Sequence, residues 1–210
     1  MLIPLKDLQK KYRMEINGIL HVGAHKAEEL LAYAPYDATT FWVEANKDLY
    51  DDLMRRFGGS HTNFPICAVV GDINGQEVKF NIANNGQSSS ILELGTHKQA
   101  HPEVHYISEE VRYMERLDGI MDTYNIPSET NFINLDIQGA ELLALRGLGE
   151  KLPQFDYIYS EVNVQSLYDG CCLLRDLDAF LSGGYDRVET EIIPQFGWGD
   201  AFWRHKRLAT

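Results

Sequence analysis

A glycine and a glutamate end two apolar runs of this chain. Residues 19–22 run into Gly23, which predicts a strand followed by a close turn. Residues 39–43 form a second run that ends at Glu44, 21 residues after Gly23. In open α/β folds, about 20 residues separate the glycine turn from the carboxylate that binds ribose hydroxyls. The pair therefore predicts a site for an adenosine-containing cofactor at the ends of two parallel strands.

The turn holds one glycine, which bears on the choice of cofactor. A dinucleotide pyrophosphate needs the pattern G-x-G-x-x-G, whereas Ala24, His25 and Ala27 stand where further glycines would be expected. S-adenosylmethionine carries adenosine and no phosphates, so one close-approach glycine suffices for it. On these features alone the alternative stays open, namely an ordinary buried turn and a solvated surface glutamate.

Three other acids are candidates for proton transfer. Residues 131–136 predict a strand that ends at Asp136, residues 156–162 predict a strand with Glu161 towards its end, and Glu141 follows Asp136 by about one helical turn. Strands of a parallel sheet end at one rim, so these acids are expected beside the cofactor. A hydroxyl acceptor needs a base within hydrogen-bond reach. The alternative for Glu141 is a first-turn acid stabilised by the helix dipole.

His25 is a further candidate base, because its ordinary pKa near 6.5 suits proton transfer at neutral pH. Residues 84–90 are polar and rich in hydroxyls, and they form either a loop that closes over a ligand or a surface connection. Residues 91–112 carry little pattern. His97, His101 and His105 are spaced four residues apart there, as metal ligands on one helix face would be, but Pro102 argues against one continuous helix, and no metal site is predicted.

The elements that would position these residues alternate between strand and helix. A lead-in helix is predicted within residues 1–17, an amphipathic helix directly after Gly23, and a hairpin-like excursion over 78–82. The remaining expected strands are 63–70, 185–192 and 199–204, and the remaining expected helices lie near 46–58, 117–124, 141–147 and 173–183. The order predicts one α/β domain over residues 1–210, with a doubly wound, mainly parallel sheet whose last strands return as an antiparallel hairpin.

The bulk composition excludes several classes of protein. The chain has 210 residues, 19 basic against 31 acidic side chains and a net charge of −12, so a nucleic-acid partner is not expected. Cys171 and Cys172 are adjacent, and with Cys67 they form no CxxC pattern, which favours a reducing compartment. Since no apolar stretch reaches the ~18 residues of a membrane span, we expect a cytoplasmic protein without membrane contact.

Six segments together resemble FkbM-type S-adenosylmethionine-dependent methyltransferases, in the family's order over residues 16–204. They are Val22-Gly23-Ala24, Val43-Glu44-Ala45-Asn46, Leu117-Asp118, Asn134-Leu135-Asp136-Ile137-Gln138-Gly139-Ala140-Glu141, Ser160-Glu161-Val162-Asn163 and Gly197-Trp198-Gly199-Asp200-Ala201. The chain departs from the usual first turn by having His21 for aspartate, His25 for asparagine and Ala27 for glycine. Gln138 stands where the family most often has glutamate.

The resemblance implies a class I, Rossmann-like methyltransferase fold with a seven-stranded sheet. It implies methyl transfer to a hydroxyl of a sugar or another small metabolite, with Asp136 the preferred base, Glu161 second and Glu141 third. The implied cofactor-binding residues are His21, Gly23, Ala24, His25, Glu44, Ala45, Ala68, Ser89 and Asp136.

Two other functions are weighed against methyl transfer. A nicotinamide-dependent oxidoreductase would share the sheet, but the phosphate glycines are missing, and neither Tyr33 nor Tyr106 has a lysine four residues later. A methyltransferase-like domain that binds its cofactor or a partner without catalysis is the second alternative, which the departures at His21 and His25 favour. The oligomeric state is left open.

Overall fold

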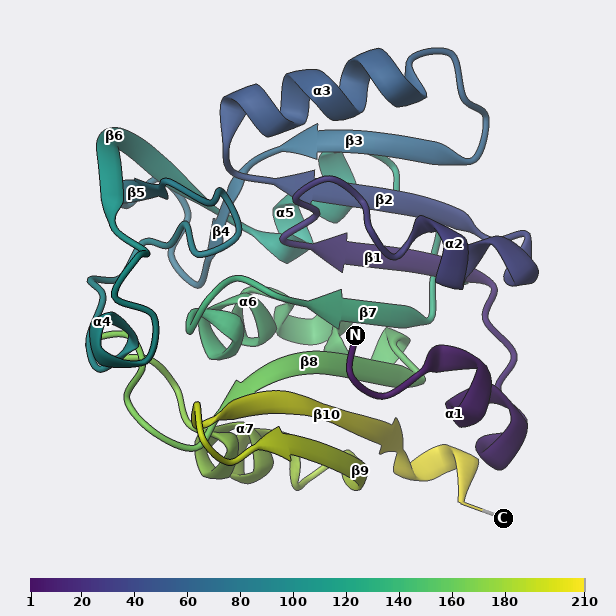
Figure 1. Ribbon diagram of the computed structural model, residues 1–210. Coiled ribbons are helices and arrows are strands. Elements are labelled where there is room, and N and C mark those ends of the chain that lie inside the picture. The colour runs from purple at the N-terminus through teal and green to yellow at the C-terminus, as the bar shows by residue number, and fades with distance from the viewer. Residues whose placement is uncertain (210) are drawn as a thin grey trace.

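Seven strands form the central sheet of the computed structural model, which describes residues 1–209 (Figure 1). In spatial order they are β3 (Asn63–Cys67), β2 (Thr39–Glu44), β1 (Gly18–Val22), β7 (Phe132–Leu135), β8 (Tyr157–Asn163), β10 (Trp198–His205) and β9 (Tyr185–Ile193). The first five are parallel, and β10 is antiparallel to both of its neighbours. The predicted mainly parallel, seven-stranded sheet with a C-terminal hairpin is confirmed. Thr210, the last residue of the predicted domain, lies outside the described residues.

Alternate side chains of the strands pack against different helices, because successive strand residues point to opposite faces. Ile19 and Phe132 belong to a core that includes α1 (Leu5–Tyr12), α2 (Leu30–Tyr33) and α3 (Lys47–Phe57). Leu20 and Ile133 belong to the opposite core, with α5 (Leu117–Thr123), α6 (Glu141–Gly147) and α7 (Leu174–Leu181). In Figure 1, α1 and α2 lie in front of the sheet, and α5, α6 and α7 lie behind it. Both sheet faces are thus covered, and the strand ends remain available for a site.

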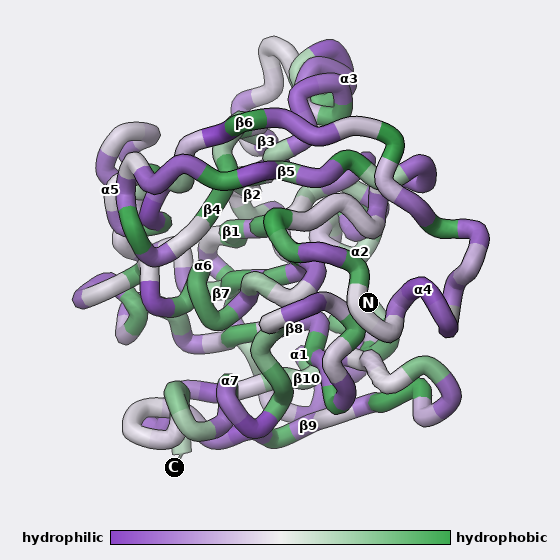
Figure 2. The backbone as a smooth tube through the Cα atoms, turned by 90° about the vertical axis from the view of Figure 1, so that its left-hand side faces the viewer, coloured by the Kyte–Doolittle hydropathy of each residue, from purple (hydrophilic) through white to green (hydrophobic). Residues whose placement is uncertain are grey.

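A second sheet stands at the carboxyl ends of the parallel strands. It has the order β4-β6-β5, formed by β4 (Val69–Gly71), β6 (Tyr106–Arg116) and β5 (Glu77–Ala83). Figure 2, which views this end, shows β5 and β6 on one side of it and α4 (His97–Ala100) on another. The single strand predicted over 63–70 is in fact β3 and β4, which belong to different sheets. Residues 91–112, where sequence gave little pattern, contain α4 and most of β6.

The amphipathic helix predicted directly after Gly23 is wrong in its start and extent. Positive φ angles of 43° at His25 and 53° at Ala27 hold this segment as irregular turns. The α-helix begins only at Leu30 and has four residues, and Leu31, expected on its apolar face, is 84% exposed. No long helix therefore directs its first N–H groups at the strand end after β1 within the described residues.

The other predicted helices are present with small shifts of boundary. Asn46 caps α3 as expected, since its side chain accepts hydrogen bonds from the N–H groups of Asp48 and Leu49. A 3₁₀ turn precedes β2 (Ala34–Tyr36), another precedes β8 (Gly149–Gln154), and a third follows β10 (Lys206–Leu208). Across residues 1–209, every helix is too short or too polar to span a bilayer.

Candidate active site

A cavity of about 580 Å³ opens where β1, β2, β7 and β8 end. Gly23, Glu44, Asp136 and Glu161 all line it, so residues more than one hundred positions apart in sequence meet at one rim of the sheet. The volume lies within the range of about 300–1,000 Å³ that small-molecule sites occupy. The cavity is therefore the candidate site for both the cofactor and its acceptor.

Gly23 holds the first turn against the neighbouring strands. The N–H groups of Gly23 and Ala24 both donate to the carbonyl of Val43 on β2, at 2.9 and 3.0 Å. Gly23 has a φ of +91°, and a Cβ there would lie 1.8 Å from the carbonyl oxygen of Asp136. Only glycine fits this contact. The backbone of Asp136, directly after β7, thus requires glycine at position 23, whereas the sequence alone had suggested that close approach of the ligand requires it.

Glu44 is buried and its carboxylate is held in place by two backbone donors. Oε2 accepts the N–H of His25 and Oε1 accepts the N–H of Asn46, each at 2.7 Å. Burial raises the pKa of Glu44, while these hydrogen bonds lower it. Each oxygen keeps a second lone pair, so the carboxylate can accept two hydroxyls from the cavity. Small side chains, Ala45 and Ala68, line the cavity beside it, which leaves room for a ribose.

His25 lines the same part of the cavity with one ring nitrogen unpaired. Nδ1 lies 2.6 Å from Oε1 of Glu28, which orients the ring. Nε2 is buried and has no hydrogen-bond partner within residues 1–209. Buried polar atoms are normally hydrogen-bonded. An atom of the bound cofactor would give Nε2 of His25 the partner that it lacks. Ser89 also lines the cavity, but its hydroxyl already donates to the carbonyl of Gly86 and accepts the N–H of Ala83.

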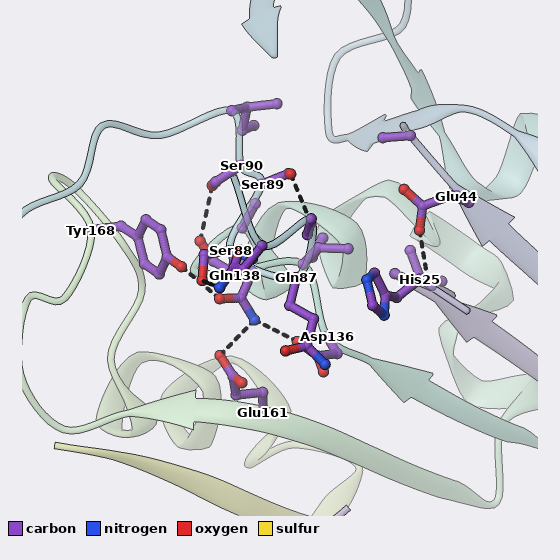
Figure 3. Close-up of a pocket in the computed structure, with 18 of the residues that line it drawn as sticks. His25, Glu44, Gln87, Ser88, Ser89, Ser90, Asp136, Gln138, Glu161 and Tyr168 are labelled. Carbon is purple, nitrogen blue, oxygen red and sulfur yellow. Dashed lines mark hydrogen bonds between the residues drawn. The ribbon is translucent and has the colours of Figure 1, made fainter. Parts of the chain in front are cut away.

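Asp136 and Glu161 face each other across the side-chain amide of Gln138 (Figure 3). Nε2 of Gln138 donates to Asp136 at 2.7 Å and to Glu161 at 3.2 Å. The hydroxyl of Tyr168 donates to Oε1 of Gln138 at 2.5 Å and so orients the amide. Burial raises the pKa of Asp136 to about 7, and the Gln138 hydrogen bond lowers it. Burial and then the charge of Asp136 raise the pKa of Glu161 well above its ordinary value.

The structure places three of the predicted site residues away from the cavity lining. His21 is buried between strands, where Nδ1 lies 2.9 Å from the Tyr33 hydroxyl and 3.3 Å from the Asn134 amide. Ala24 belongs to the core on the α1 face. Glu141 is fully buried, and its Oε1 accepts the N–H groups of Ile137 and Gly139 at 3.1 and 3.0 Å.

These positions correct the earlier expectations. His21 and Ala24 support the first turn from behind rather than from within the cavity. Glu141 secures the loop between β7 and α6, so it is neither placed as a base nor exposed as a first-turn acid. A catalytic base needs one oxygen within reach of the acceptor, whereas Oε1 of Glu141 accepts two backbone N–H groups, Oε2 accepts from the Cys172 thiol at 3.6 Å, and the residue does not line the cavity.

Other cavity residues were missed as functional candidates. Gln138 was noted only as a departure from the family pattern, although its side chain joins the two candidate bases. Tyr168 and His97 come from segments without periodicity, so the sequence did not single out either residue as one that lines the cavity. Asp200 could have been found, because its strand returns antiparallel beside β8 and pairs Asp200 with Glu161.

The histidines spaced by four residues do not share a helix face. His97 starts α4, which ends at residue 100, and the ring centroids of His97 and His101 are 5.0 Å apart. Over residues 1–209, no group of three or more His, Cys, Asp or Glu side chains is arranged to hold a metal ion.

The strand order, the glycine turn at the end of β1 and the acid at the end of β2 define a class I methyltransferase architecture. The chain belongs to the family described as the methyltransferase FkbM domain, whose model matches residues 21–188. S-adenosylmethionine is the cofactor of this family, and the Gly23 turn, the paired Glu44 oxygens and the unpaired His25 nitrogen fit it. Comparison with curated protein sequences finds no match.

Solved methyltransferases have the same fold at low sequence identity. Magnesium protoporphyrin IX methyltransferase from Synechocystis PCC 6803, solved with bound S-adenosylmethionine, superimposes with a TM-score of 0.53 at 7% identity, over 96% of this chain and 76% of that one. The fibrillarin/Nop5p complex superimposes with a TM-score of 0.51 at 10% identity, over 91% of this chain and 74% of that one. Aeropyrum pernix fibrillarin with S-adenosylmethionine gives 0.49 at 11% identity, over 90% of this chain and 66% of its own length.

Proposed function

We propose that this protein transfers a methyl group from S-adenosylmethionine to a hydroxyl oxygen of a sugar or another small metabolite. The observation that carries the proposal is the position of Asp136, whose carboxylate is exposed to the cavity and joined to Glu161 through the Gln138 amide. Desolvation within the cavity raises the pKa of Asp136 to about 7. A general base works best when its pKa lies near the working pH. Asp136 therefore has the acidity expected of a group that takes a proton from a hydroxyl.

The residues around Asp136 fall into two groups, one that binds the cofactor and one that faces the acceptor. The Gly23 turn and Glu44 hold the adenosine half of the cofactor, and the cavity beyond Asp136 admits the acceptor. The bound cofactor supplies a methyl group that its sulfonium already makes electrophilic. The chain's remaining task is to align the acceptor oxygen with that methyl group and remove its proton.

The shared amide assigns different roles to the two carboxyl groups. Two acids joined through one amide titrate as a pair, and proximity to Asp136 raises the pKa of Glu161. In the cavity without acceptor, Glu161 therefore keeps the proton and Asp136 is the free base. Glu161 then orients the acceptor hydroxyl, or replaces Asp136 as base when the pair exchanges its proton.

The partner supported by these features is a small molecule rather than a nucleic acid. The chain's net charge is −12, and a phosphate backbone requires clustered basic side chains. The site is also a cavity of about 580 Å³, a size typical of small-molecule sites.

The test is single-turnover methyl transfer to a panel of hydroxyl acceptors, with cofactor affinity measured by calorimetry in parallel. Asp136→Asn should lower the rate by about 10²–10⁴ and leave cofactor affinity nearly unchanged. Glu150→Gln, which changes an exposed acid, is the matched control. Near-normal rates in both Asp136→Asn and Glu161→Gln would overturn the assignment of the base. Tight binding of S-adenosylmethionine with no transfer to any acceptor would favour the non-catalytic alternative, and binding of NADH instead would favour the oxidoreductase.

A further inference from the structure

Three carboxylates stand side by side on adjacent strands at the cavity rim. Glu161 on β8 is registered directly opposite Asp200 on β10. The last paired residues of β7 and β8 are Leu135 and Ser160. Asp136 and Glu161 are the next residues on the two strands, so they lie beside each other. Laterally paired residues share one face of a sheet, and like charges directly opposite one another are destabilising. A ligand that carries positive charge or hydrogen-bond donors would therefore stabilise these three carboxylates.

The rest of the cavity neutralises this row only in part, through the N-terminal ammonium group of Met1, which lies 3.6 Å from Glu29. Among the described residues, seven acids line the cavity and no lysine or arginine does; the acids are Glu28, Glu29, Glu44, Glu103, Asp136, Glu161 and Asp200. S-adenosylmethionine itself brings two cationic groups and one carboxylate, a net single positive charge. Where these acids are ionised, the cofactor and the Met1 ammonium leave most of their negative charge uncompensated, and an anionic acceptor such as a sugar phosphate would add to it.

The acceptor side of the cavity holds an unpartnered buried imidazole. His97 lines the cavity and is 7% exposed, and its Nδ1 has no hydrogen-bond partner in residues 1–209. Its ring packs on Tyr168, with centroids 5.4 Å apart, and Tyr168 orients Gln138 between the two candidate bases. Burial lowers the pKa of His97, so at neutral pH the ring offers hydrogen bonds without charge. A polyhydroxyl acceptor would satisfy it.

We propose that the acceptor is a hydroxyl compound that also carries an ammonium group, bound against Asp200 and Glu161, with a neighbouring hydroxyl on His97. This rests on the proposed function and adds the substrate class. Asp200 Oδ2 accepts hydrogen bonds from the Tyr159 hydroxyl and the Leu2 N–H, so the carboxylate is anchored while Oδ1 has no partner in the described part of the chain. A metal ion is disfavoured as the cation because the acids are spread along a row instead of grouped.

The spacing of the strands limits the size of the acceptor. Neighbouring strands lie about 4.8 Å apart, so Asp200 is about 10 Å across the sheet from Asp136. An ammonium group between Glu161 and Asp200 is then on the order of 5–10 Å from the oxygen that loses its proton to Asp136. Amino sugars span this distance, and short amino alcohols do not.

Three sugars of similar size and different charge test the proposal: glucosamine, glucose and glucose 6-phosphate. Each is titrated into the protein saturated with S-adenosylhomocysteine, and methyl transfer is then measured with S-adenosylmethionine. Glucosamine should bind at least tenfold more tightly than glucose, and glucose 6-phosphate more weakly than either. Asp200→Asn, which keeps an acceptor for Tyr159, should reduce the glucosamine preference to within twofold without changing the melting temperature or S-adenosylhomocysteine affinity. Glu150→Gln should leave the preference intact.

The outcomes separate this inference from the proposed function. Equal binding of the three sugars, including no binding by any of them, would overturn the inference, as would a glucosamine preference that survives in Asp200→Asn. Methyl transfer to glucose with no advantage for glucosamine would overturn the inference and keep the proposed function. Failure of both S-adenosylmethionine and S-adenosylhomocysteine to bind would overturn the proposed function itself.

Discussion

The side-chain amide of Gln138 donates a hydrogen bond of 2.7 Å to Oδ1 of Asp136. Gln138 reaches this position from a φ of +56°, in a left-handed conformation that costs an ordinary residue about 1–2 kcal/mol. The amide favours the ionised form of Asp136 and opposes the effect of burial. The family's more frequent glutamate would put a third acid between Asp136 and Glu161.

Replacing Gln138 should change the pH dependence of the reaction. In Gln138→Leu the donor is lost, so the pKa of Asp136 rises and the acidic limb of the pH–rate profile moves to higher pH, by about one unit. Single-turnover rates between pH 5.5 and 9 measure this shift. Tyr168→Phe, which keeps the donor and removes only its orienting bond, should move the limb less. An unchanged limb in Gln138→Leu would show that Asp136 is not the titrating base.

Asp136→Asn should stabilise the folded protein at alkaline pH. Because the folded pKa of Asp136, about 7, exceeds the usual 3.8, the wild type loses stability as pH rises through the folded pKa, whereas asparagine does not titrate. Relative to wild type, the free energy of unfolding of Asp136→Asn should rise by about 1 kcal/mol between pH 5.5 and 8.5, because Asp136 is exposed to the cavity and water screens part of the effect. Urea unfolding at both pH values checks this; a difference that shrinks at high pH contradicts the raised pKa.

Glu44→Gln should weaken the binding of S-adenosylmethionine. Glu44 lines the cavity with both oxygens held by N–H groups, and the amide would replace one acceptor oxygen with a donor. Losing one or two charge-assisted hydrogen bonds costs about 2–4 kcal/mol, or roughly 30- to 1,000-fold in affinity. Calorimetry against Glu150→Gln measures the change. Affinity within threefold of wild type would place the ribose elsewhere.

Gly23→Ala should destabilise the fold as well as the site. The added Cβ would lie 1.8 Å from the Asp136 carbonyl oxygen at a φ of +91°, so β1 and β7 must separate. Gly59 provides the control: its φ is +86°, with nothing in residues 1–209 within 4 Å of an added Cβ. Gly59→Ala should cost about 1 kcal/mol, and Gly23→Ala more than about 3 kcal/mol. Equal losses in urea unfolding would mean that the Asp136 contact is unimportant.

Glu141 should behave as a structural residue. Glu141→Ala leaves the N–H groups of Ile137 and Gly139 without their acceptor, at about 1–3 kcal/mol for each buried group. Glu141→Gln keeps an acceptor oxygen and should recover most of that stability. Both variants are compared by chemical denaturation and by single-turnover rate. If Glu141→Gln folded normally but lost activity as Asp136→Asn is expected to, the assignment of Glu141 to the loop would be wrong.

The strand ends were predictable because strands leave a strong apolar pattern. Gly23, Glu44, Asp136 and Glu161 each follow or end such a run, and parallel strands bring their ends to one rim. All four line the cavity. The sheet and its final hairpin followed from the same alternation of strands and helices.

The remaining features depend on contacts that periodicity does not record. His25 and Ala27 have positive φ angles, which apolar spacing could not reveal, so an amphipathic helix was predicted where turns occur. Glu141 reads as a helix-start acid, and only the loop that folds back over it shows its two N–H partners. His97 and Tyr168 meet across the cavity from segments without pattern, because their positions are set by packing between distant parts of the chain.

The separation of the two sheets has a consequence for how this protein can diversify. Gly23 and Glu44 lie at the ends of strands of the seven-stranded sheet, whereas β4, β5 and β6 form a separate sheet. The segment from Asn84 to His105, which joins β5 to β6, supplies Ser88 and His97 to the cavity. Insertions or exchanges in this segment can alter the shape of the acceptor space without breaking a hydrogen bond of the seven-stranded sheet. Mutational libraries confined to this segment, with the cofactor candidate Ser89 kept unchanged, therefore offer a route to new acceptors that preserves the methyl-donor site.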